Sequence, residues 1–358
     1  MIDSSFLFDT ARNLYGELSY ASNSGKALIP LRYILEITYR CNLRCPYCYV
    51  GEHSSSYEMS TAEVLDIIKQ IPSFGFVTLV GGEPLIRQDF LEIFEAASKQ
   101  TLGKTNLITN GSLLTEEISE SLIKNKLILL SVSLDGYGEN HDKNRQKEGL
   151  FEKVTGNLEI FNSKRKNKPL VDIKTVVLEN NLDDLPKLYK YSKDMGFDFF
   201  SMAFKRNNML KQNSCLRDTF GEEFYKEEYP IEQYFDMEHF KEIYKELISL
   251  SKNSKTLLRW APKFKPRGDI SKIEDFFSKG NTPVKDIYKK CVFPYSNIFI
   301  NPEGDIYPCL ALKVGNIRGK KIKDVLNTPE YRCFRKNLKA SKLFNSCQMC
   351  CELVPKNL

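Results

Sequence analysis

The feature that most constrains the fold is an alternation of apolar runs and helical segments between residues 33 and 204. Six runs are rich in β-branched and aromatic residues, namely YILEITY, FVTLV, TNLIT, LILLSVSL, VDIKTVVL and FDFFSMAF. The intervening segments repeat apolar residues with helical periodicity, for example at Leu150, Phe151, Val154, Leu158 and Phe161, and at Leu185, Leu188 and Tyr189. Strands that alternate with helices predict an α/β fold with a parallel sheet. Six such units can form an open sheet or a partial (β/α)6 TIM-like barrel, and both collect reactive groups at the carboxyl ends of the strands.

Residues 33–204 form the predicted barrel segment, and the remaining residues divide into three further segments. The length of 358 residues is typical of two domains. Residues 1–32 are an N-terminal extension, and residues 205–286 are predicted to be a bridging or inserted segment because they mix charged and aromatic residues. Residues 287–358 are predicted to form a small C-terminal hairpin domain, with Asn301 to Gly304 as a turn between two short strands.

Composition excludes several classes of protein. Hydrophobic residues make up 42% and charged residues 27% of the chain, which is typical of a globular protein and not of a disordered one. The net charge of +6 is spread along the sequence, so we expect no nucleic-acid partner. No run approaches the length of a membrane-spanning helix, and the N-terminus lacks a secretory pattern. We therefore expect a cytoplasmic protein without a membrane partner.

The cysteines fall into two groups. Three of the ten lie between Cys41 and Cys48, six lie between Cys291 and Cys351, and Cys215 stands alone. Because the cytoplasm keeps thiols reduced, clustered cysteines indicate metal binding rather than disulfides.

The first group follows the first predicted strand, where a loop can wrap thiolates around one metal centre. Cys41, Cys45 and Cys48 are spaced by four and three residues. Three protein ligands leave a position for another molecule, whereas a closed structural site normally takes four. A zinc knuckle with a distant fourth ligand is the alternative, and unliganded structural thiols are a further one.

Two motifs together resemble the radical SAM superfamily. The first is CxxxCxxC with an aromatic residue, Tyr47, just before the last cysteine, and the second is GGEP, residues 81–84, after the second predicted strand. The resemblance implies that Cys41, Cys45 and Cys48 hold a [4Fe–4S] cluster to which S-adenosylmethionine (SAM) binds. It further implies that one electron splits SAM to give a 5′-deoxyadenosyl radical, with an electron donor such as flavodoxin or ferredoxin as partner.

The same resemblance implies roles for further residues. The GGEP backbone and Glu83 would bind the methionyl ammonium, and Arg145 would pair with the methionyl carboxylate. Ser133 and Asp135 would lie near the ribose. The residues implied to contact SAM are Tyr47, Gly81, Gly82, Glu83, Asn110, Ser133, Asp135 and Arg145. A structural role stays open for Glu83 at a glycine turn, and for Asn110, Asp135 and Arg145 as turn caps or members of an ion pair.

The second group of cysteines resembles the SPASM and twitch extensions of radical SAM enzymes, in which a hairpin and a later CxxC hold an auxiliary cluster. A turn at Asn301 to Gly304 would bring Cys291 and Cys309 together. The resemblance implies a second [4Fe–4S] cluster on Cys291, Cys309, Cys347 and Cys350. Cys351 is an alternative to Cys350, and zinc on the same thiolates is an alternative to the cluster. The shorter, twitch-like version is favoured because no cysteine follows Cys351. Cys215 and Cys333 receive no role.

The resemblance implies an enzyme whose radical abstracts hydrogen from a substrate, for which a peptide or protein side chain is the favoured choice. The alternative is oxidation or deamination of a small molecule, such as a sugar or aminocyclitol, in a biosynthetic pathway. The 32 residues before the first strand are expected to be too few for a winged-helix leader-binding domain, which weakens the peptide hypothesis. A non-catalytic zinc or iron–sulfur scaffold is an alternative of another class, but it does not explain the GGEP motif.

Overall fold

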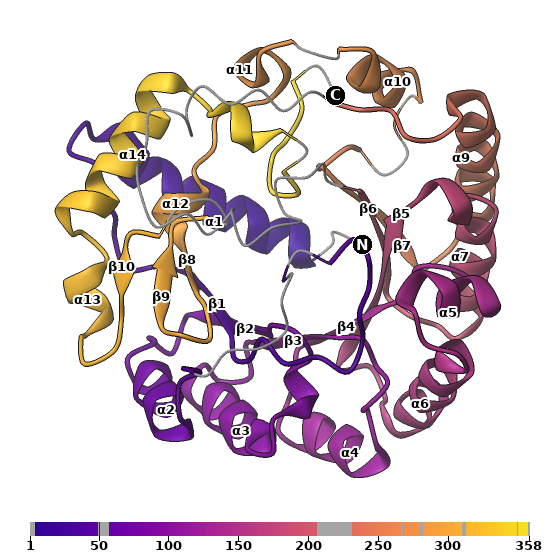
Figure 1. Cartoon of the computed structure of the whole chain (residues 1–358), viewed down its shortest axis with the longest axis horizontal. Helices are drawn as coiled ribbons and strands as arrows, with labels where there is room; N and C mark the ends of the chain where they lie inside the picture. Colours follow the sequence, from indigo (N-terminus) through magenta and orange to yellow (C-terminus); the bar gives the residue numbers. More distant parts are fainter. Residues whose placement is uncertain are drawn as a thin grey trace.

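The structure is a computed structural model that describes residues 4–48, 50, 57–205, 231–265, 268, 270–279, 282–309, 313–348 and 350–356. Its strands form one ten-stranded sheet in the order β10-β9-β8-β1-β2-β3-β4-β5-β6-β7. Figure 1 shows this sheet curving into an open ring, with α2 to α7 and α9 on the outside and α1 across the middle of the view. The strands are β1 (Arg32–Glu36), β2 (Phe76–Val80), β3 (Thr105–Thr109), β4 (Leu129–Ser133), β5 (Leu170–Val177), β6 (Phe199–Phe204), β7 (Leu257–Ala261), β8 (Asn297–Ile300), β9 (Asp305–Tyr307) and β10 (Gly315–Asn316).

Strands β1 to β7 pair in parallel with their neighbours. The helices around and after them are α1 (Ser4–Ala21), α2 (Thr61–Lys69), α3 (Phe90–Gln100), α4 (Glu116–Lys124), α5 (Glu139–Arg145), α6 (Leu150–Lys164), α7 (Asp184–Asp194), α9 (Met237–Ser251), α10 (Ser271–Ser278), α11 (Val284–Ile287), α12 (Phe293–Ser296), α13 (Ile322–Val325) and α14 (Pro329–Ser341). The parallel pairing of β1 to β7 confirms the predicted partial barrel, and strands β1 to β6 confirm all six predicted strands. Strand β7 was not predicted from the sequence: it is a short run in the charge-rich segment with Arg259 at its centre.

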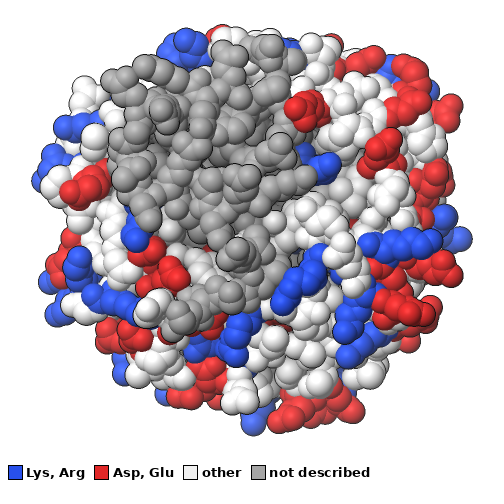
Figure 2. All heavy atoms as spheres, viewed as in Figure 1, with Lys and Arg blue, Asp and Glu red and all other residues white. Residues whose placement is uncertain are grey.

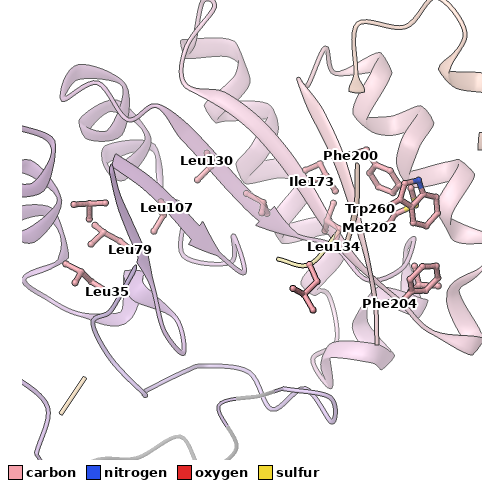
Figure 3. Close-up of a cluster of buried hydrophobic side chains, with 14 of the residues drawn as sticks. Leu35, Leu79, Leu107, Leu130, Leu134, Ile173, Phe200, Met202, Phe204 and Trp260 are labelled. Carbon is pink, nitrogen blue, oxygen red and sulfur yellow. The ribbon is translucent and has the colours of Figure 1, made fainter. Parts of the chain in front are cut away.

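The core lies between the sheet and the outer helices. Figure 3 shows it continuing from Leu35 and Leu79 on one side through Leu130 to Phe200 and Trp260 on the other. The two predicted helical faces are buried in α6 and α7, at Leu150, Phe151, Val154, Leu158, Phe161, Leu185, Leu188 and Tyr189. Burial of these faces holds the crossover helices against the strands that carry the site.

Polar side chains occupy strand positions that alternate with the core. On β5, Asp172 and Lys174 flank the buried Ile173 and therefore lie on the opposite, inner face of the sheet. Ser201 Oγ on β6 donates a hydrogen bond of 2.6 Å to Asp172 Oδ1, and Lys174 Nζ lies 3.2 Å from Asp172 Oδ2. The inner face thus carries paired charges and hydroxyl groups.

The C-terminal hairpin belongs to the same sheet. β8 pairs in parallel with the free edge of β1, and β8 pairs in antiparallel fashion with β9. Between them, Asn301 Oδ1 accepts hydrogen bonds from the backbone N–H groups of Glu303 (3.0 Å) and Asp305 (2.7 Å), while Gly304 has a φ of 83°. The predicted turn at Asn301 to Gly304 is therefore confirmed.

The surface shows no segregation of charge on the face in Figure 2, where the described basic and acidic side chains are intermingled. In the described part of the chain, no helix has both the length and the apolar character that crossing a membrane requires.

An ion pair fastens the loop between β2 and α3 to the end of β1. Arg87 is buried, and its Nη1 donates to the carbonyl oxygens of Ile37 (2.7 Å) and Met59 (3.1 Å). Its Nε donates to Asp89 Oδ1 at 2.8 Å, and Thr61 Oγ1 donates to Asp89 Oδ2 at 2.6 Å. The hydrogen bonds from Arg87 lower the pKa of Asp89 to about 2, because they favour the carboxylate.

Asp89→Asn should lower the free energy of unfolding by about 1–2 kcal/mol at pH 7, a value reduced for partial solvent exposure. A lowered pKa stabilises the fold above the unfolded pKa of about 4 and loses that effect as pH falls toward the folded pKa. The difference between wild type and variant should therefore shrink from pH 7 to pH 3 in urea unfolding. Glu148→Gln, at an exposed loop carboxylate, is the control. An equal loss at both pH values would contradict the assignment.

Candidate active site

The first three cysteines lie together in the loop after β1. Leu43 N–H donates to Cys41 Sγ at 3.4 Å, and Cys48 N–H donates to the Cys45 carbonyl at 3.1 Å. All three side chains are half-buried; Cys48 acts on the charge state of Cys41, and both of these cysteines act on that of Cys45. Burial raises the pKa of Cys41, and it raises the pKa of Cys45 to about 11. Arg145 opposes this rise at both cysteines, yet their pKa values stay raised, so they are thiols at pH 7 and a metal centre would supply the further charge that makes them thiolates.

The cysteine loop contacts a buried carboxylate at the end of β4. Tyr47 Oη donates to Asp135 Oδ2 at 2.7 Å, and Arg145 Nη2 donates to the same oxygen. Val176 N–H donates to Asp135 Oδ1 at 2.7 Å. Arg145 Nε is buried without a hydrogen-bond partner among the described residues, and Arg145 lowers the pKa of Cys45. The structure thus brings three predicted residues, Tyr47, Asp135 and Arg145, beside the predicted ligands.

His141 is part of this site, although the sequence analysis singled out only Arg145 from the surrounding segment. The Asp135 backbone N–H donates to His141 Nδ1 at 3.0 Å, while Asn144 and Asn181 donate to the Asp135 carbonyl oxygen. Burial lowers the pKa of His141 to about 4, so the ring is neutral at pH 7. The proton-bearing nitrogen is then Nε2. Because Nδ1 accepts a hydrogen bond from the Asp135 amide, His141 fixes the position of Asp135. This contact forms only because the fold brings α5 back onto β4, so the sequence alone does not reveal it.

Glu83 joins the ends of β2 and β3. It is fully buried, and it accepts hydrogen bonds from Thr109 Oγ1 (2.7 Å), Asn110 N–H (2.7 Å) and Leu85 N–H (3.1 Å). Burial raises the pKa of Glu83, and these hydrogen bonds oppose the rise. Asn110 Nδ2 donates in turn to Asn42 Oδ1 at 2.9 Å, inside the cysteine loop. Glu83 and Asn110 are therefore connected to the predicted ligands, and their contact with SAM stays a prediction.

Gly81 and Gly82 are glycines because the cysteine loop packs directly on them. A Cβ atom at Gly82 would lie 2.4 Å from the Arg40 carbonyl oxygen, and one at Gly81 would lie 2.3 Å from the Thr38 carbonyl oxygen. Gly81 also has a φ of 151°, which L residues rarely adopt. Glu83 N–H donates to the Arg40 carbonyl at 2.9 Å. The GGEP backbone therefore sets the position of the residues that precede Cys41.

Ser133, the last predicted SAM contact, lies at the end of β4 and is half-buried beside Lys174 in the strand register. The sequence analysis missed Asp172, which is 1% exposed on the inner face of the sheet next to Ser131 and Ser201. The period-two alternation in VDIKTVV was the signal that could have identified it.

The C-terminal cysteines come from segments around the hairpin: Cys291 precedes α12, Cys309 follows β9, and Cys350 N–H donates to the Cys347 carbonyl at 3.2 Å. Cys291, Cys309, Cys347 and Cys350 are half-buried and pack against one apolar core. Burial raises the pKa of Cys291 to about 11 and of Cys347 to about 12, and the Cys291 side chain raises the latter further. Cys351 is also half-buried and Cys333 is exposed on α14. Cys215 falls outside the described residues.

A carboxylate beside these cysteines ties the end of the chain to the barrel. Glu352 lies 3.2 Å from Arg12 on α1, 3.2 Å from Arg32 on β1 and 3.3 Å from Lys263 after β7. These cations hold the pKa of Glu352 well below its usual range in spite of burial. The turn that carries Cys347 and Cys350 is thereby held against the inner side of β1.

The donor chemistry of both cysteine groups suits iron–sulfur clusters, because thiolates are the protein ligands of such clusters. Within the described ranges, no group of three or more His, Cys, Asp or Glu side chains already has a geometry that could hold a metal ion. Cys41, Cys45 and Cys48 lie in the loop after β1, and Cys347 ends a short 3-10 helix, Asn345–Cys347.

Comparison with protein families gives two matches. The family model of the Radical SAM superfamily matches residues 35–192, and that of the SPASM iron–sulfur cluster-binding domain matches residues 291–351. The first range contains Cys41, Cys45 and Cys48, and the second contains Cys291, Cys309, Cys347 and Cys350. Each predicted cysteine group thus falls in a family match.

Two curated relatives differ in how much of the chain they match. The AdoMet-dependent heme synthase of Methanosarcina barkeri is 30% identical over 326 residues, which cover 88% of this chain and 86% of the relative. The PqqA peptide cyclase of Bradyrhizobium diazoefficiens is 33% identical over 186 residues, which cover 49% of this chain and 46% of the relative.

Solved structures show the same fold. Streptococcus suis SuiB bound to the precursor peptide SuiA has a TM-score of 0.65 and 18% identity, with 94% of this chain and 73% of SuiB covered. Native anSMEcpe with bound AdoMet has a TM-score of 0.57 and 23% identity, with 85% of this chain and 82% of that protein covered.

Gly82→Ala should impair loading of the first cluster, because its Cβ would displace the Arg40 carbonyl just before Cys41. Displacements of about 1 Å can cost about a hundredfold in rate, so we expect SAM cleavage to fall by that order. Iron content after anaerobic reconstitution and 5′-deoxyadenosine formation are the two measurements. Gly156→Ala on α6, where an added Cβ meets nothing within 4 Å, is the matched control. Normal loading of Gly82→Ala would contradict the packing argument.

Proposed function

This chain belongs to the radical SAM superfamily, and on that premise we propose that it abstracts a hydrogen atom from a peptide or protein side chain. It is an enzyme that binds a [4Fe–4S] cluster together with SAM, and its C-terminal region is an auxiliary iron–sulfur cluster-binding domain. In this proposal residues 33–204 bind SAM, residues 205–286 bridge the two parts, and residues 287–358 hold one auxiliary [4Fe–4S] cluster.

The arrangement around the first cysteines supports the ligand assignment. Cys41, Cys45 and Cys48 would hold the first cluster, which when bound supplies the electron that cleaves SAM to a 5′-deoxyadenosyl radical. Arg145 offers a buried cation beside Cys45 and suits the methionyl carboxylate. Asp135, held by Val176 and by the His141 ring, orients both Arg145 and Tyr47. The chain therefore positions charged groups before SAM arrives.

Other SAM contacts follow the same assignment. The backbone of Gly81 and Gly82 and the Glu83 carboxylate would receive the methionyl ammonium. Ser133 and Asp135 would lie near the ribose, at the carboxyl end of β4. Asn110 would act through Asn42 on the cysteine loop, since these two amides are hydrogen bonded.

The observation that carries the substrate proposal is the polar inner face of the sheet. Lys174 on β5 is a partly exposed cation, Ser201 on the adjacent β6 carries a hydroxyl group, and the buried Asp172 contacts both of them. A peptide offers complementary amides, carbonyls and charged side chains at regular spacing. The similarity to the PqqA peptide cyclase over the first half of the chain supports the same substrate class.

A small molecule is the second candidate substrate, and one observation favours it. The relative that matches 88% of this chain is named an AdoMet-dependent heme synthase, so its product is a small molecule. The inner-face charges suit a polar small molecule as well as a peptide, and the substrate experiment below separates the two classes.

The electron would come from a protein donor such as flavodoxin or ferredoxin. Arg44 is exposed after Cys41, and Arg40, before Cys41, is about half exposed and lies 3.4 Å from Glu58. Positive charges at this place would attract a negatively charged donor to the loop that holds the first cluster.

Replacing Cys41, Cys45 and Cys48 together by Ala should reduce 5′-deoxyadenosine formation to background, because SAM would lose the iron to which it binds. Iron content should fall from about eight to about four per chain, since each cubane holds four irons. Cys333→Ala, at the exposed cysteine of α14, should change neither value. Cleavage of SAM by the triple variant would remove the ligand assignment.

Deuterium transfer tests the substrate class. The source organism is grown in deuterated medium, and its extract is separated by dialysis into macromolecular and small-molecule fractions. We expect the macromolecular fraction to transfer deuterium to 5′-deoxyadenosine, detected by mass spectrometry, and protease digestion beforehand to remove the transfer. The triple cysteine variant is the negative control. Transfer from the small-molecule fraction alone would replace the peptide by the second candidate.

A further inference from the structure

Strand β7 brings a second cation to the polar inner face of the sheet. Arg259 lies between Leu258 and Trp260, which are buried in the core, so its side chain lies on the opposite, inner face. Arg259 is paired in register with Ser201 on β6, and Ser201 is paired with Lys174 on β5. The two cations therefore lie two strands apart in one row, with a hydroxyl group between them.

The two cations contact neighbouring residues of one layer of the sheet. The central carbon of the Arg259 guanidinium lies 3.2 Å from the centre of the Phe199 ring. Lys174 Nζ lies 3.2 Å from Asp172 Oδ2, and Asp172 is paired in register with Phe199. Ser201 Oγ donates to the other oxygen of Asp172 at 2.6 Å. Because adjacent strands are about 5 Å apart, the Cα atoms of Lys174 and Arg259 are about 10 Å apart, a gap that two long side chains can span.

These contacts hold the two cations in place and leave them accessible. The Lys174 side chain is 40% exposed, and Arg259 is partly exposed. An ammonium has three donors, of which the contact with Asp172 occupies one. A guanidinium over an aromatic ring is held through its face, while its N–H donors project from its edge, the arrangement that binds a carboxylate through two parallel hydrogen bonds. Lys174 and Arg259 thus match the charge and the donor geometry that an anionic oxygen group needs.

The row begins beside the predicted SAM site. Ser133, which is predicted to lie near the ribose, is paired in register with Lys174. The strand order β4-β5-β6-β7 therefore places Lys174 next to that site and Arg259 two strands further away. A substrate group bound by both cations would lie beside SAM on the inner face of the sheet, and the rest of the substrate would extend toward β4.

We propose that Lys174 and Arg259 bind a carboxylate group of the substrate and so determine which substrates are accepted. The inference rests on the proposed function, because it concerns the molecule from which hydrogen is abstracted. A carboxylate with one negative charge fits better than a phosphate ester, because the buried Asp172 would repel the second charge of the phosphate. In a peptide this group is an aspartate or glutamate side chain or the C-terminus. Lys174 and Arg259 are specificity-determining residues, while Asp172 is a positioning residue that holds Lys174.

Blocking the carboxylates of the substrate tests the proposal without changing the protein. The two fractions of the deuterium-transfer experiment are each treated with a carbodiimide and ethanolamine, which convert carboxylates to neutral amides. Portions treated with acetic anhydride, which blocks amines, are the matched control. We expect deuterium transfer to fall about tenfold after amidation, since hydrogen bonds to charged groups contribute about that much, and to persist after acetylation. Unchanged transfer after amidation would overturn the proposal.

Substitution of the two cations in the full chain is the second test. Arg259→Gln and Lys174→Gln should each lower deuterium transfer about tenfold relative to 5′-deoxyadenosine formation, because the substrate would lose a charged partner. Arg259→Lys and Lys174→Arg keep the charge and should retain more of the transfer than the Gln variants. Lys190→Gln, at an exposed position of α7, is the control. An equal fall in transfer and in 5′-deoxyadenosine formation would overturn the proposal, because the cations would then hold SAM or the fold.

The two proposals fail in different ways. If neither untreated fraction transfers deuterium, the proposed hydrogen abstraction fails, and this inference fails with it before any variant is compared. If the small-molecule fraction alone transfers deuterium, the peptide is replaced as substrate, and amidation of that fraction decides whether a carboxylate is bound. If a variant does not retain iron, the amidation experiment decides alone, because it uses the unchanged protein.

Discussion

The structure depends on strand β1 being hydrogen bonded along both of its edges. On one side β2 pairs with it in parallel and brings the GGEP loop beside the cysteine loop, and on the other side β8 pairs with it in parallel and brings the C-terminal hairpin. Tyr39, just before Cys41, accepts a hydrogen bond of 2.7 Å from Asn301 Nδ2 in the hairpin turn. One short strand therefore joins the loop that carries Cys41 to the hairpin that lies between Cys291 and Cys309.

Both an ion pair and neutral contacts hold the first cysteine loop. Glu58 accepts hydrogen bonds from Thr38 Oγ1 (2.8 Å) and Tyr39 N–H (2.7 Å), and its Oε2 lies 3.4 Å from Arg40 Nε. Glycines at 81 and 82 allow backbone to pack on backbone, and Asn42 contacts Asn110 and Ser112 through hydrogen bonds of 2.9 and 2.8 Å. Asp135 and Arg145 form a further ion pair near Cys45, and Arg145 lowers the pKa of Cys45. Fixed charges at these places shift the pKa values of the cysteines, so they set part of the electric field that a bound ligand would meet.

Local patterns in the sequence predicted the parts of the fold that depend on neighbouring residues. The six strands, the buried faces of α6 and α7 and the turn at Asn301 to Gly304 each follow from periodicity or turn chemistry over a few residues. The pairing of β8 with β1, which joins residues more than 260 positions apart, leaves no local signal. The same limit applies to His141 and Asp172, whose roles arise from contacts between different elements. Motif resemblance supplied the candidate ligands, since thiol spacing alone also fits zinc.

Two buried charges in the C-terminal region are compensated in opposite ways. Glu352 is surrounded by Arg12, Arg32 and Lys263, whereas the described partners of Arg335 are backbone carbonyls, the Asn327 amide oxygen and aromatic rings. Arg12 and Lys263 also lower the pKa of Cys291, which burial raises. Because cluster ligands bind as thiolates, these two cations would favour binding by Cys291, and cluster loading would then be coupled to folding of the C-terminal region.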